Sequence, residues 1–403
     1  MQKNNANSSK SRPARGRQGN NKRSVRGGGR AKSTLDPLLL IQEASLDQEP
    51  QFKHVVTREY ADFSLQQSLK DNIQKMGFTQ PTPIQDQTFE SLVDGRDLIG
   101  IASTGTGKTG AFLIPLLERF LTKETATYET LVVVPTRELA LQVADELRKL
   151  TVGLKVRSAC FIGGTNVEKD VRTLKNKFDF IIGTPGRLLD LKNRGSLKFH
   201  TMDVLVLDEF DKMLDMGFVH DIQTIAKYMV SRTQTLLFSA TRDKKQQQII
   251  NQLVESPLVV ELSSGDTSSK NVNQDIIRVE QGQNKFDLLQ NLIVDGGFDK
   301  VILFTETKHL AKRLSGQLNA AGIKSDEIHG NKSQNYRVNA LKKFKTGAIR
   351  VLVATDVAAR GIDVSDVSLV VNYELPTDFD TYIHRVGRTG RAGKTGTAYT
   401  FVD

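Results

Sequence analysis

The sequence predicts an α/β protein with two tandem parallel-sheet domains behind a basic tail, and three observations lead to this prediction. Short apolar runs alternate with segments of helical period from Tyr60 onward, which is typical of parallel sheets buried on both faces. A glycine-rich turn separates an apolar run from a helical segment at residues 97–117. A stretch rich in Ser and Asn at residues 263–274 has the composition of a flexible linker, and the alternation restarts after it.

The composition is that of a globular protein and argues against two other classes. The chain has 403 residues, of which 38% are hydrophobic and 25% are charged, enough for two or three domains. Apolar runs stay well short of the ~20 residues of a membrane span, and the polar N-terminus does not resemble a secretion signal. Cys160 is the only cysteine, which excludes an intrachain disulfide and favours a reducing, cytoplasmic location.

The tail at residues 1–35 carries the charge of the chain. Its first 33 residues contain ten Lys or Arg and no acid, while the net charge of the whole chain is +10. The segment lacks an apolar period, so we expect it to be disordered and to attract phosphate backbones. A solubilising or targeting tail, including a nuclear address, is the alternative. Residues 36–60 are predicted to connect it to the first domain, with one short helix.

The first domain is predicted over residues 61–262 and begins with a helix. The helical period runs through Phe63, Leu65, Leu69, Ile73 and Met76. Residues 78–85 follow, in which two prolines fix an extended turn before the next helix. Gln85 has the donor and acceptor needed to read the edge of adenine, and Phe78 offers a ring face. Taken alone, this segment would be a loop with a core aromatic, but its place before the glycine-rich turn favours a base pocket.

The glycine-rich turn has the order of a phosphate-binding loop. Its residues are Ala102, Ser103, Thr104, Gly105, Thr106, Gly107, Lys108 and Thr109. Glycines let several N–H groups face one anion, and the helix that follows directs its positive end toward it. Lys108 can reach the outer phosphates of ATP, and the Thr109 hydroxyl can hold Mg²⁺. The strict pattern begins with Gly where this chain has Ala102, and a chance turn between strand and helix is the alternative.

Five more apolar runs are predicted as strands of the first sheet, with helices at Glu138–Leu150 and Ile222–Met229. The runs are Leu131–Val134, Ala159–Ile162, Phe180–Ile182, Val204–Leu207 and Leu236–Phe238. Ligands of a parallel sheet lie at the carboxyl ends of its strands, and Asp208 and Glu209 follow one of these runs. One carboxylate can hold Mg²⁺ while the other orients and deprotonates the attacking water. An acid that simply ends a strand is the alternative for a single carboxylate.

The second domain is predicted over residues 275–403 and contains no comparable glycine-rich turn. Its expected strands and helices are Val301–Phe304, Leu310–Ala320, Tyr336–Phe344, Val351–Val353, Leu369–Val371, Thr381–Val386 and Thr397–Val402. Arg385, Arg388 and Arg391 lie within seven residues of each other. An arginine brought to a γ-phosphate from another domain stabilises transition-state charge, whereas the simpler interpretation is a solvated basic turn.

Taken in order, these motifs resemble those of the DEAD-box family of ATP-dependent RNA helicases over about residues 63–403. The resemblance implies two RecA-like domains, with ATP and Mg²⁺ as cofactors. The family's phosphate loop begins with Ala, as at Ala102. Phe63, Phe78 and Gln85 would form the adenine site, and the hydrolysis motif corresponds to residues 208–211. Asp208 would then hold the metal, and Glu209 would act as the base.

The same resemblance implies roles for the remaining residues. Asp363 would touch the nucleotide, and Arg388 and Arg391 would reach the γ-phosphate. ATP and RNA would be coupled through Asp211, Ser239, Thr241 and His384. RNA would be bound by shape through its phosphates and 2′-hydroxyls, with contacts from Thr136, Arg137, Gly164, Thr184, Arg187, Thr305, Arg337 and Thr355.

Two features depart from the family pattern. Phe210 replaces the Ala of the family name, so we expect altered packing behind the metal site but intact hydrolysis. The chain ends at Asp403, directly after the strand Thr397–Val402. Family members usually continue with a closing helix, so the second domain is expected to be short at its C-terminus.

Two functional hypotheses of different class follow, and a third is weaker. The first is an RNA-dependent ATPase, acting as a monomer, that remodels short RNA duplexes and ribonucleoproteins. The second is an ATP-gated RNA clamp or annealing factor whose basic tail anchors RNA while strand separation is incidental. A DNA translocase is the third, and 2′-hydroxyl contacts favour RNA over DNA.

Overall fold

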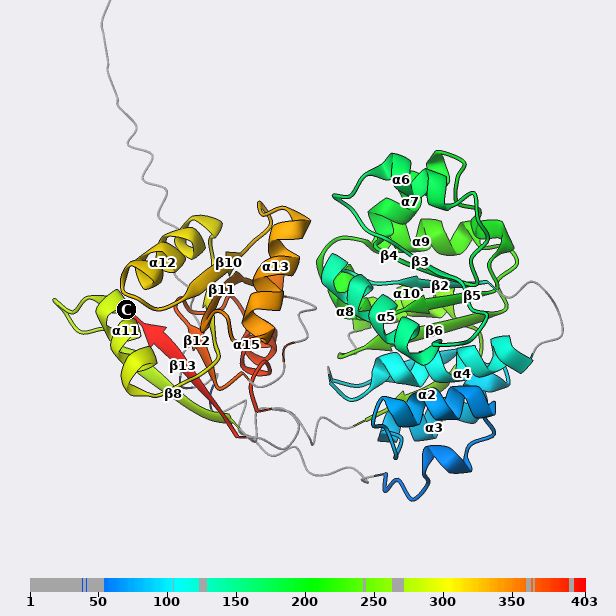
Figure 1. Ribbon diagram of the computed structural model, residues 1–403, viewed down its shortest axis with the longest axis horizontal. Helices are drawn as coiled ribbons and strands as arrows, with labels where there is room; N and C mark the ends of the chain where they lie inside the picture. Colours follow the sequence, from blue (N-terminus) through cyan, green and yellow to red (C-terminus); the bar gives the residue numbers. More distant parts are fainter. Residues whose placement is uncertain are drawn as a thin grey trace, which may run out of the picture. The chain divides into compact units, whose positions relative to one another are not determined.

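A computed structural model of the chain describes residues 38, 41, 54–103, 105–122, 129–241, 244–262, 272–359, 364, 367–390 and 395–403. The predicted tail at residues 1–35 lies outside the described residues. In the predicted connecting segment, Leu38 and Ile41 are helical, as expected for one short helix there. The described chain contains two parallel sheets, each with its own helices (Figure 1), and we call residues 54–262 lobe 1 and residues 272–403 lobe 2.

Lobe 1 contains a seven-stranded parallel sheet with the order β3-β4-β2-β5-β6-β1-β7. The strands are β1 (Leu98–Ile101), β2 (Thr130–Val133), β3 (Ser158–Phe161), β4 (Phe180–Gly183), β5 (Val204–Leu207), β6 (Gln234–Ser239) and β7 (Leu258–Glu261). In β1 the register places Leu98 opposite Leu236 of β6 and Leu258 of β7. Every residue of β1, β2, β4, β5 and β6 is buried, which explains why these strands read as unbroken apolar runs.

The helices of lobe 1 pack against two apolar cores. They are α2 (Gln67–Lys75), α3 (Pro83–Val93), α4 (Lys108–Thr122), α5 (Arg137–Leu150), α6 (Val167–Thr173), α7 (Pro185–Asn193), α8 (Phe210–Asp215), α9 (Val219–Tyr228) and α10 (Lys244–Leu253), with 3-10 turns η1 (Tyr60–Asp62) and η2 (Phe199–Thr201). Leu98 joins the core beneath α2–α5, and its neighbour Ile99 joins the core beneath α7–α10. Alternate residues of β1 therefore face opposite helical layers.

Helix α2 starts later than the apolar period suggests. Phe63 and Leu65 are buried ahead of it, in the loop that follows η1. Both belong to the core beneath α2–α5, so their spacing reflects shared burial rather than one continuous helix. Among the described residues, no helix combines the length and apolar character that crossing a bilayer requires.

Lobe 2 contains a six-stranded parallel sheet with the order β10-β11-β9-β12-β13-β8. Its elements are β8 (Val272–Arg278), α11 (Lys285–Asp295), β9 (Val301–Thr305), α12 (Lys308–Ala320), β10 (Ser325–Ile328), α13 (Gln334–Lys345), β11 (Val351–Thr355), α14 (Asp356–Ala359), β12 (Leu369–Asn372), α15 (Phe379–Val386) and β13 (Gly396–Val402). Strand β8 pairs with β13 from Val272 opposite Gly396 to Arg278 opposite Val402. Residues 272–274 of the predicted linker are therefore part of β8, and residues 263–271 lie outside the described residues.

Candidate active site

The turn between β1 and α4 is shaped for a phosphate chain. The buried Lys108 crosses it, and its Nζ donates to the Ala102 carbonyl at 2.7 Å. Gly105 and Gly107 have φ values of 90° and 89°, which residues with a Cβ rarely adopt. Helix α4 is 15 residues long and starts at Lys108, so its free N–H groups face the turn. Thr104 lies outside the described residues.

Gln85 links this loop to the predicted base pocket. Its Nε2 donates to the Gly107 carbonyl at 3.0 Å, and its Oε1 accepts from the Thr82 N–H at 2.7 Å. The same oxygen accepts a hydrogen bond from the Tyr60 hydroxyl at 2.7 Å. Gln85 therefore connects the start of the lobe to the phosphate loop. Phe78, the predicted ring face for the base, is 45% exposed.

The aromatic side chain that contacts Gln85 is Tyr60, which the sequence analysis did not single out. Phe63 belongs to the same core cluster as Tyr60, with its ring edge-on to Phe89 at a centroid distance of 4.6 Å. Tyr60 and Phe63 are themselves 5.8 Å apart between ring centroids. The sequence carried one signal for Tyr60, because a tyrosine at the start of the apolar period would be buried and its hydroxyl would then need a polar partner.

Two buried carboxylates follow β5, at the sheet edge where the phosphate loop follows β1. Asp208 Oδ1 accepts from the Glu209 N–H at 2.9 Å, and Glu209 has a left-handed backbone with φ 53°. Burial raises the pKa of Asp208 to about 6, although the positive charge of Lys108 opposes that rise. A cation beside Asp208 would restore its ionised form. Together with the Thr109 hydroxyl, Asp208 offers the oxygen ligands that Mg²⁺ prefers, so these two residues fit the metal.

Glu209 is paired with Lys212, a second residue that the sequence analysis missed. Lys212 Nζ lies 2.7 Å from Glu209 Oε1, and their side chains are 1% and 7% exposed. Burial alone would raise the pKa of Glu209, but the positive charges of Lys212 and, to a smaller extent, Lys108 help to offset this, and the pKa is lowered. Arg388 adds a smaller contribution in the same direction. Oε2 of Glu209 has no hydrogen-bond partner within the described part of the chain, so it can accept a proton from water.

Phe210 belongs to the core rather than to the reacting centre. Its side chain is fully buried and joins the apolar core beneath α7–α10, together with Met213 of the same helix. The ring thus contributes to the packing that supports α8, the helix that begins directly after Glu209.

The predicted coupling residues connect α8 to the end of β6. Asp211 Oδ2 accepts from the Ala240 N–H at 3.3 Å, and Ser239 Oγ donates to the Thr241 carbonyl at 2.7 Å. A movement of Asp211 would therefore reach the turn that follows β6. His384, the fourth predicted coupling residue, lies on α15 in lobe 2.

The predicted RNA contacts of lobe 1 follow three adjacent strands, β2, β3 and β4. Thr136 caps α5 by accepting from the Leu139 N–H at 3.3 Å, and Thr184 occupies the same position before α7. A Cβ added to Gly164 would lie 2.4 Å from Arg137 Nη1, so the arginine depends on this glycine to approach the backbone. The sheet order therefore brings these four residues to one edge.

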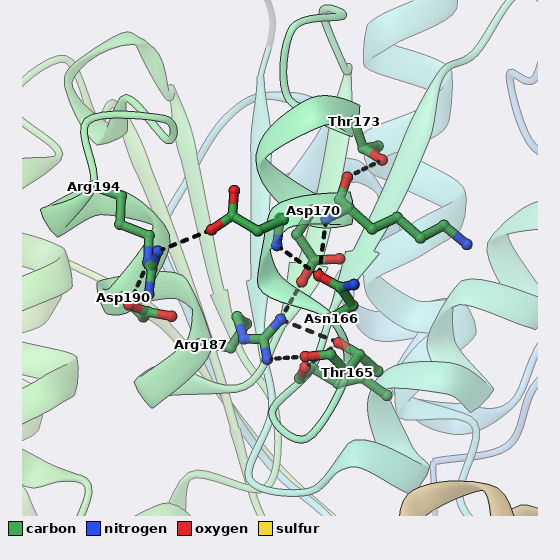
Figure 2. A network of polar contacts seen from close by, with 10 residues as sticks. Thr165, Asn166, Asp170, Thr173, Arg187, Asp190 and Arg194 are labelled. Atoms are coloured by element: carbon green, nitrogen blue, oxygen red, sulfur yellow. Dashed lines mark hydrogen bonds and ion pairs between the residues drawn. The ribbon is translucent and has the colours of Figure 1, made fainter.

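Arg187 is held in a polar network between α6 and α7, as Figure 2 shows. Its Nη2 donates to the Thr165 carbonyl at 2.8 Å, its Nη1 donates to Thr165 Oγ1 at 3.1 Å, and it is also paired with Asp170. The side chain is 8% exposed. Arg187 therefore fixes the loop at Thr165, next to Gly164, and has little free surface of its own.

Two of the three predicted RNA contacts of lobe 2 share a sheet edge, and the third, Arg337, lies on α13. Thr305 and Thr355 are opposite each other at the ends of β9 and β11. Thr305 is fully buried, and its hydroxyl donates to the Thr307 carbonyl at 3.3 Å. Arg337 donates to the Ala358 carbonyl at 3.3 Å and is paired with Glu138 at 3.0 Å.

The three clustered arginines do not share one environment. Arg385 is 2% exposed and binds both carboxylate oxygens of Asp356, at 2.7 and 2.9 Å, and the Glu374 carbonyl at 2.9 Å. It is therefore a core residue of lobe 2. Arg388 is buried as well, whereas Arg391 and the predicted nucleotide contact Asp363 lie outside the described residues.

Comparison with known proteins identifies relatives of both lobes. The family model of DEAD/DEAH box helicases matches residues 82–249, and the helicase conserved C-terminal domain matches residues 284–393. The DEAD-box ATP-dependent RNA helicase CshA of Geobacillus kaustophilus (strain HTA426) is 43% identical over 343 residues, covering 85% of this chain and 73% of that protein. CshA of Bacillus subtilis (strain 168) is 42% identical over 347 residues, covering 86% and 70%.

Solved structures resemble the whole described fold. Dbp5 of S. cerevisiae bound to RNA and ADP BeF3 has a TM-score of 0.75 and 32% identity, covering 86% of this chain and 90% of that one. Mss116p bound to single-stranded RNA and AMP-PNP has a TM-score of 0.77 and 30% identity, covering 87% and 77%.

Proposed function

The chain belongs to the DEAD-box family of ATP-dependent RNA helicases, and from this premise we propose that it couples RNA-dependent ATP hydrolysis to local opening of short RNA duplexes and ribonucleoproteins. One observation supports this most directly. The phosphate loop follows β1 and the Asp208–Glu209 pair follows β5, at one edge of the same sheet, and Lys108 acts on the charge of Asp208. A triphosphate bound there would contact Lys108 and lie beside Glu209, the carboxylate assigned as the base.

Each residue of this site has a separate task in hydrolysis. Lys108 neutralises charge on the outer phosphates, and Gln85 orients the base. Asp208, acting through water, and the Thr109 hydroxyl would hold Mg²⁺, which when bound neutralises phosphate charge. Oε2 of Glu209 accepts the proton of the attacking water. Arg388 and Arg391 stabilise the charge that develops on the γ-phosphate.

RNA enters this scheme as the partner that completes the site. The eight predicted RNA contacts lie at strand ends, in the turns that follow strands, or on helices such as α7 and α13, and most would bind the backbone of one strand. Binding would therefore be independent of sequence and would leave the opposite strand of a short duplex displaced. The two lobes supply one complete ATP site, so a monomer suffices. Cys160 is a free thiol, which suits a reducing cytoplasm.

The test is phosphate release with and without RNA for the wild-type chain and for Glu209→Gln. We expect RNA to stimulate the wild type, and the substitution to lower turnover by about 10²–10⁴-fold, the usual contribution of a general base. Glu261→Gln, at an exposed position on β7, is the matched control and should behave as wild type. A wild-type rate that does not respond to RNA would refute the proposal.

An ATP-gated clamp or annealing factor is the second candidate, and the ten basic residues of the tail favour it. Deleting residues 1–33 should weaken RNA binding and flatten its dependence on salt, because fewer counterions are released. Strand separation of short duplexes then discriminates the two. ATP-dependent retention of RNA without separation supports the clamp.

A further inference from the structure

We propose that four side chains, two ahead of α3 and two within it, position Gln85 and thereby the part of the ATP site assigned to the adenine base, which we call the base-binding corner. Arg58 is the central residue of the four. The four are His54, Arg58, Asp86 and Glu90, and we call them the clasp. The inference rests on the proposed function, because it assigns Gln85 to the base of ATP. It adds positioning residues that lie outside the motifs of the sequence analysis.

The clasp is built on a buried carboxylate. Asp86 is the residue after Gln85 on α3, and its side chain is 7% exposed. Arg58 Nη2 lies 2.7 Å from Asp86 Oδ1, and His54 Nε2 lies 2.5 Å from Oδ2. Each oxygen of this carboxylate therefore has its own partner, as a buried charge requires.

Arg58 makes several directional contacts that together orient its guanidinium, although the side chain is 36% exposed. Besides Asp86, it is paired with Glu90 one turn further along α3, at 2.6 Å. Its Nη2 also donates to the Asp86 carbonyl at 3.1 Å, and its guanidinium lies 4.4 Å from the centre of the Phe63 ring. A lysine could not reproduce these contacts, because its ammonium is a point charge rather than a planar fork.

The clasp holds a segment that has no regular structure. Residues 54–59 form neither helix nor strand, so their position depends on side-chain contacts. Tyr60 follows directly, and its N–H donates to the Thr79 carbonyl at 2.9 Å. Arg58 therefore fixes the chain two residues before the hydroxyl that binds Gln85.

A continuous series of contacts leads from the clasp to the phosphate loop. The Tyr60 hydroxyl donates to Gln85 Oε1 at 2.7 Å, and Gln85 Nε2 donates to the Gly107 carbonyl at 3.0 Å. Asp86 supports Gln85 in a second way, because the two residues are adjacent on α3 and a fixed Asp86 limits the movement of that turn of the helix. Loss of Arg58 should therefore loosen the Gln85 amide while Lys108 and Glu209, at the ends of other elements, stay in place.

The test compares ATP with UTP for Arg58→Ala at saturating RNA. UTP has the same triphosphate but lacks the adenine edge that Gln85 is assigned to read. We expect the KM for ATP to rise about tenfold, as for the loss of one or two buried hydrogen bonds. The KM for UTP and the kcat for ATP should not change. Arg58→Lys should recover only part of the loss, because it restores the charge without the fork.

Two further variants complete the design. Tyr60→Phe removes the hydroxyl and should give the same ATP-specific rise, even if Arg58→Ala fails to fold. Arg148→Ala is the matched control, because Arg148 is an exposed arginine (73%) on α5. Equal changes in both KM values, or a lower Tm with an unchanged ratio of KM values, would show that the clasp is only a structural anchor and would overturn the inference.

The same assay separates failure of this inference from failure of the proposed function. RNA stimulation of the wild type is measured in each experiment and tests the proposed function by itself. If the wild type responds to RNA but has equal KM values for ATP and UTP, Gln85 does not read adenine. The clasp would then have no base-binding corner to position, and the inference is overturned while the RNA-dependent ATPase stands.

Discussion

At the scale of single residues, two ion pairs have different consequences. Lys212 and Glu209 lie at the proposed hydrolysis site, where Lys212 binds Oε1 of Glu209 while Oε2 has no partner among the described residues. Arg385 is buried in lobe 2, whereas the side chain of its partner Asp356 is 28% exposed, and both belong to the second sheet rather than to the phosphate loop. Removing one member leaves the other charge without its partner, so both pairs should matter for folding, and only the first for hydrolysis.

Replacing Lys212 by Met tests the first pair. The change leaves Glu209 buried without its cation, so we expect a loss of about 3–5 kcal/mol in the free energy of unfolding. The double variant Lys212→Met with Glu209→Gln should recover part of this loss, since no buried charge is then unpaired. Urea unfolding of the four chains measures the coupling. Additive losses in the double variant would contradict the pairing.

Replacing Arg385 by Ala tests the second pair. Asp356 would lose both bonds to the guanidinium, and the Glu374 carbonyl would lose its donor, at a cost of about 3–5 kcal/mol. Arg278→Ala, at an exposed site on β8, is the control and should stay within about 0.5 kcal/mol. Equal stabilities of the two variants in urea would show that Arg385 is not a core residue.

Cys160 gives a prediction for pH. Burial raises the pKa of its thiol from an ordinary 9.0 to about 12, so at pH 9 the folded chain carries far less thiolate than the unfolded chain. Between pH 9 and 12 the thiol keeps its proton in the folded chain but loses it in the unfolded chain. The contribution of Cys160 to the free energy of unfolding is therefore present below pH 9 and is lost as pH rises toward 12. Alkylation at pH 9 should therefore be slow until urea unfolds lobe 1, and rapid alkylation of the folded chain would contradict this.

At the scale of elements, the phosphate loop depends on its neighbour α3. The carbonyl of Gly107 binds Gln85, and the loop glycines differ in what surrounds them. A Cβ at Gly107 would lie 2.7 Å from Thr82 Oγ1, whereas a Cβ at Gly105 would meet nothing within 4 Å. The start of α3 and the phosphate loop are therefore in close contact at Gly107 but not at Gly105.

This difference predicts unequal effects of two alanine substitutions. Gly105→Ala should suffer only backbone strain of about 1–2 kcal/mol from its left-handed conformation. Gly107→Ala adds collisions with Thr82 and Gln85, so its loss of ATP affinity should be clearly larger. Calorimetric titration with ATP measures both Kd values. Equal losses would mean that the α3 contact does not shape the loop.

The strands that could be predicted from the sequence are those whose burial produces an unbroken run of apolar residues. The runs at Val204–Leu207 and Val301–Phe304 became β5 and β9 almost residue for residue, because both faces of these strands are covered. Strand β10 was missed because its sequence, Ser-Asp-Glu-Ile, carries polar side chains that are buried by partners such as Asn319 and Tyr336. Such partners come from other elements and leave no periodic signal.

The same distinction holds for the site. Lys108, Asp208 and Glu209 follow predicted strands of one parallel sheet, so their place at its carboxyl edge could be predicted from the chain, whereas the strand order could not. The partners of Tyr60 and Lys212 could not be predicted, because the contacts with Gln85 and Glu209 depend on packing, even though the Tyr60 hydroxyl itself was visible in the sequence. Family resemblance selected Phe63, which lies in the same core cluster as Tyr60, and its assignment to the adenine site stays a prediction.

At the scale of the whole molecule, the proposed ATP site draws on both sheets. Lobe 1 would contribute the phosphate loop, Gln85 and the two carboxylates. Lobe 2 would contribute Arg388, whose charge acts on both Glu209 and Lys212. Such a division makes hydrolysis depend on whatever brings the lobes together, and RNA is the partner that the strand-end residues of both lobes would bind.

The decisive measurement is the rate of single-turnover ATP hydrolysis with and without single-stranded RNA. For the wild type we expect a strong increase with RNA. For Arg388→Ala we expect a loss of about 10³–10⁵-fold in the RNA-stimulated rate, as for other arginines supplied to a γ-phosphate. Hydrolysis that is equally fast without RNA, or an Arg388→Ala chain that responds to RNA as the wild type does, would contradict an ATP site shared by the two lobes.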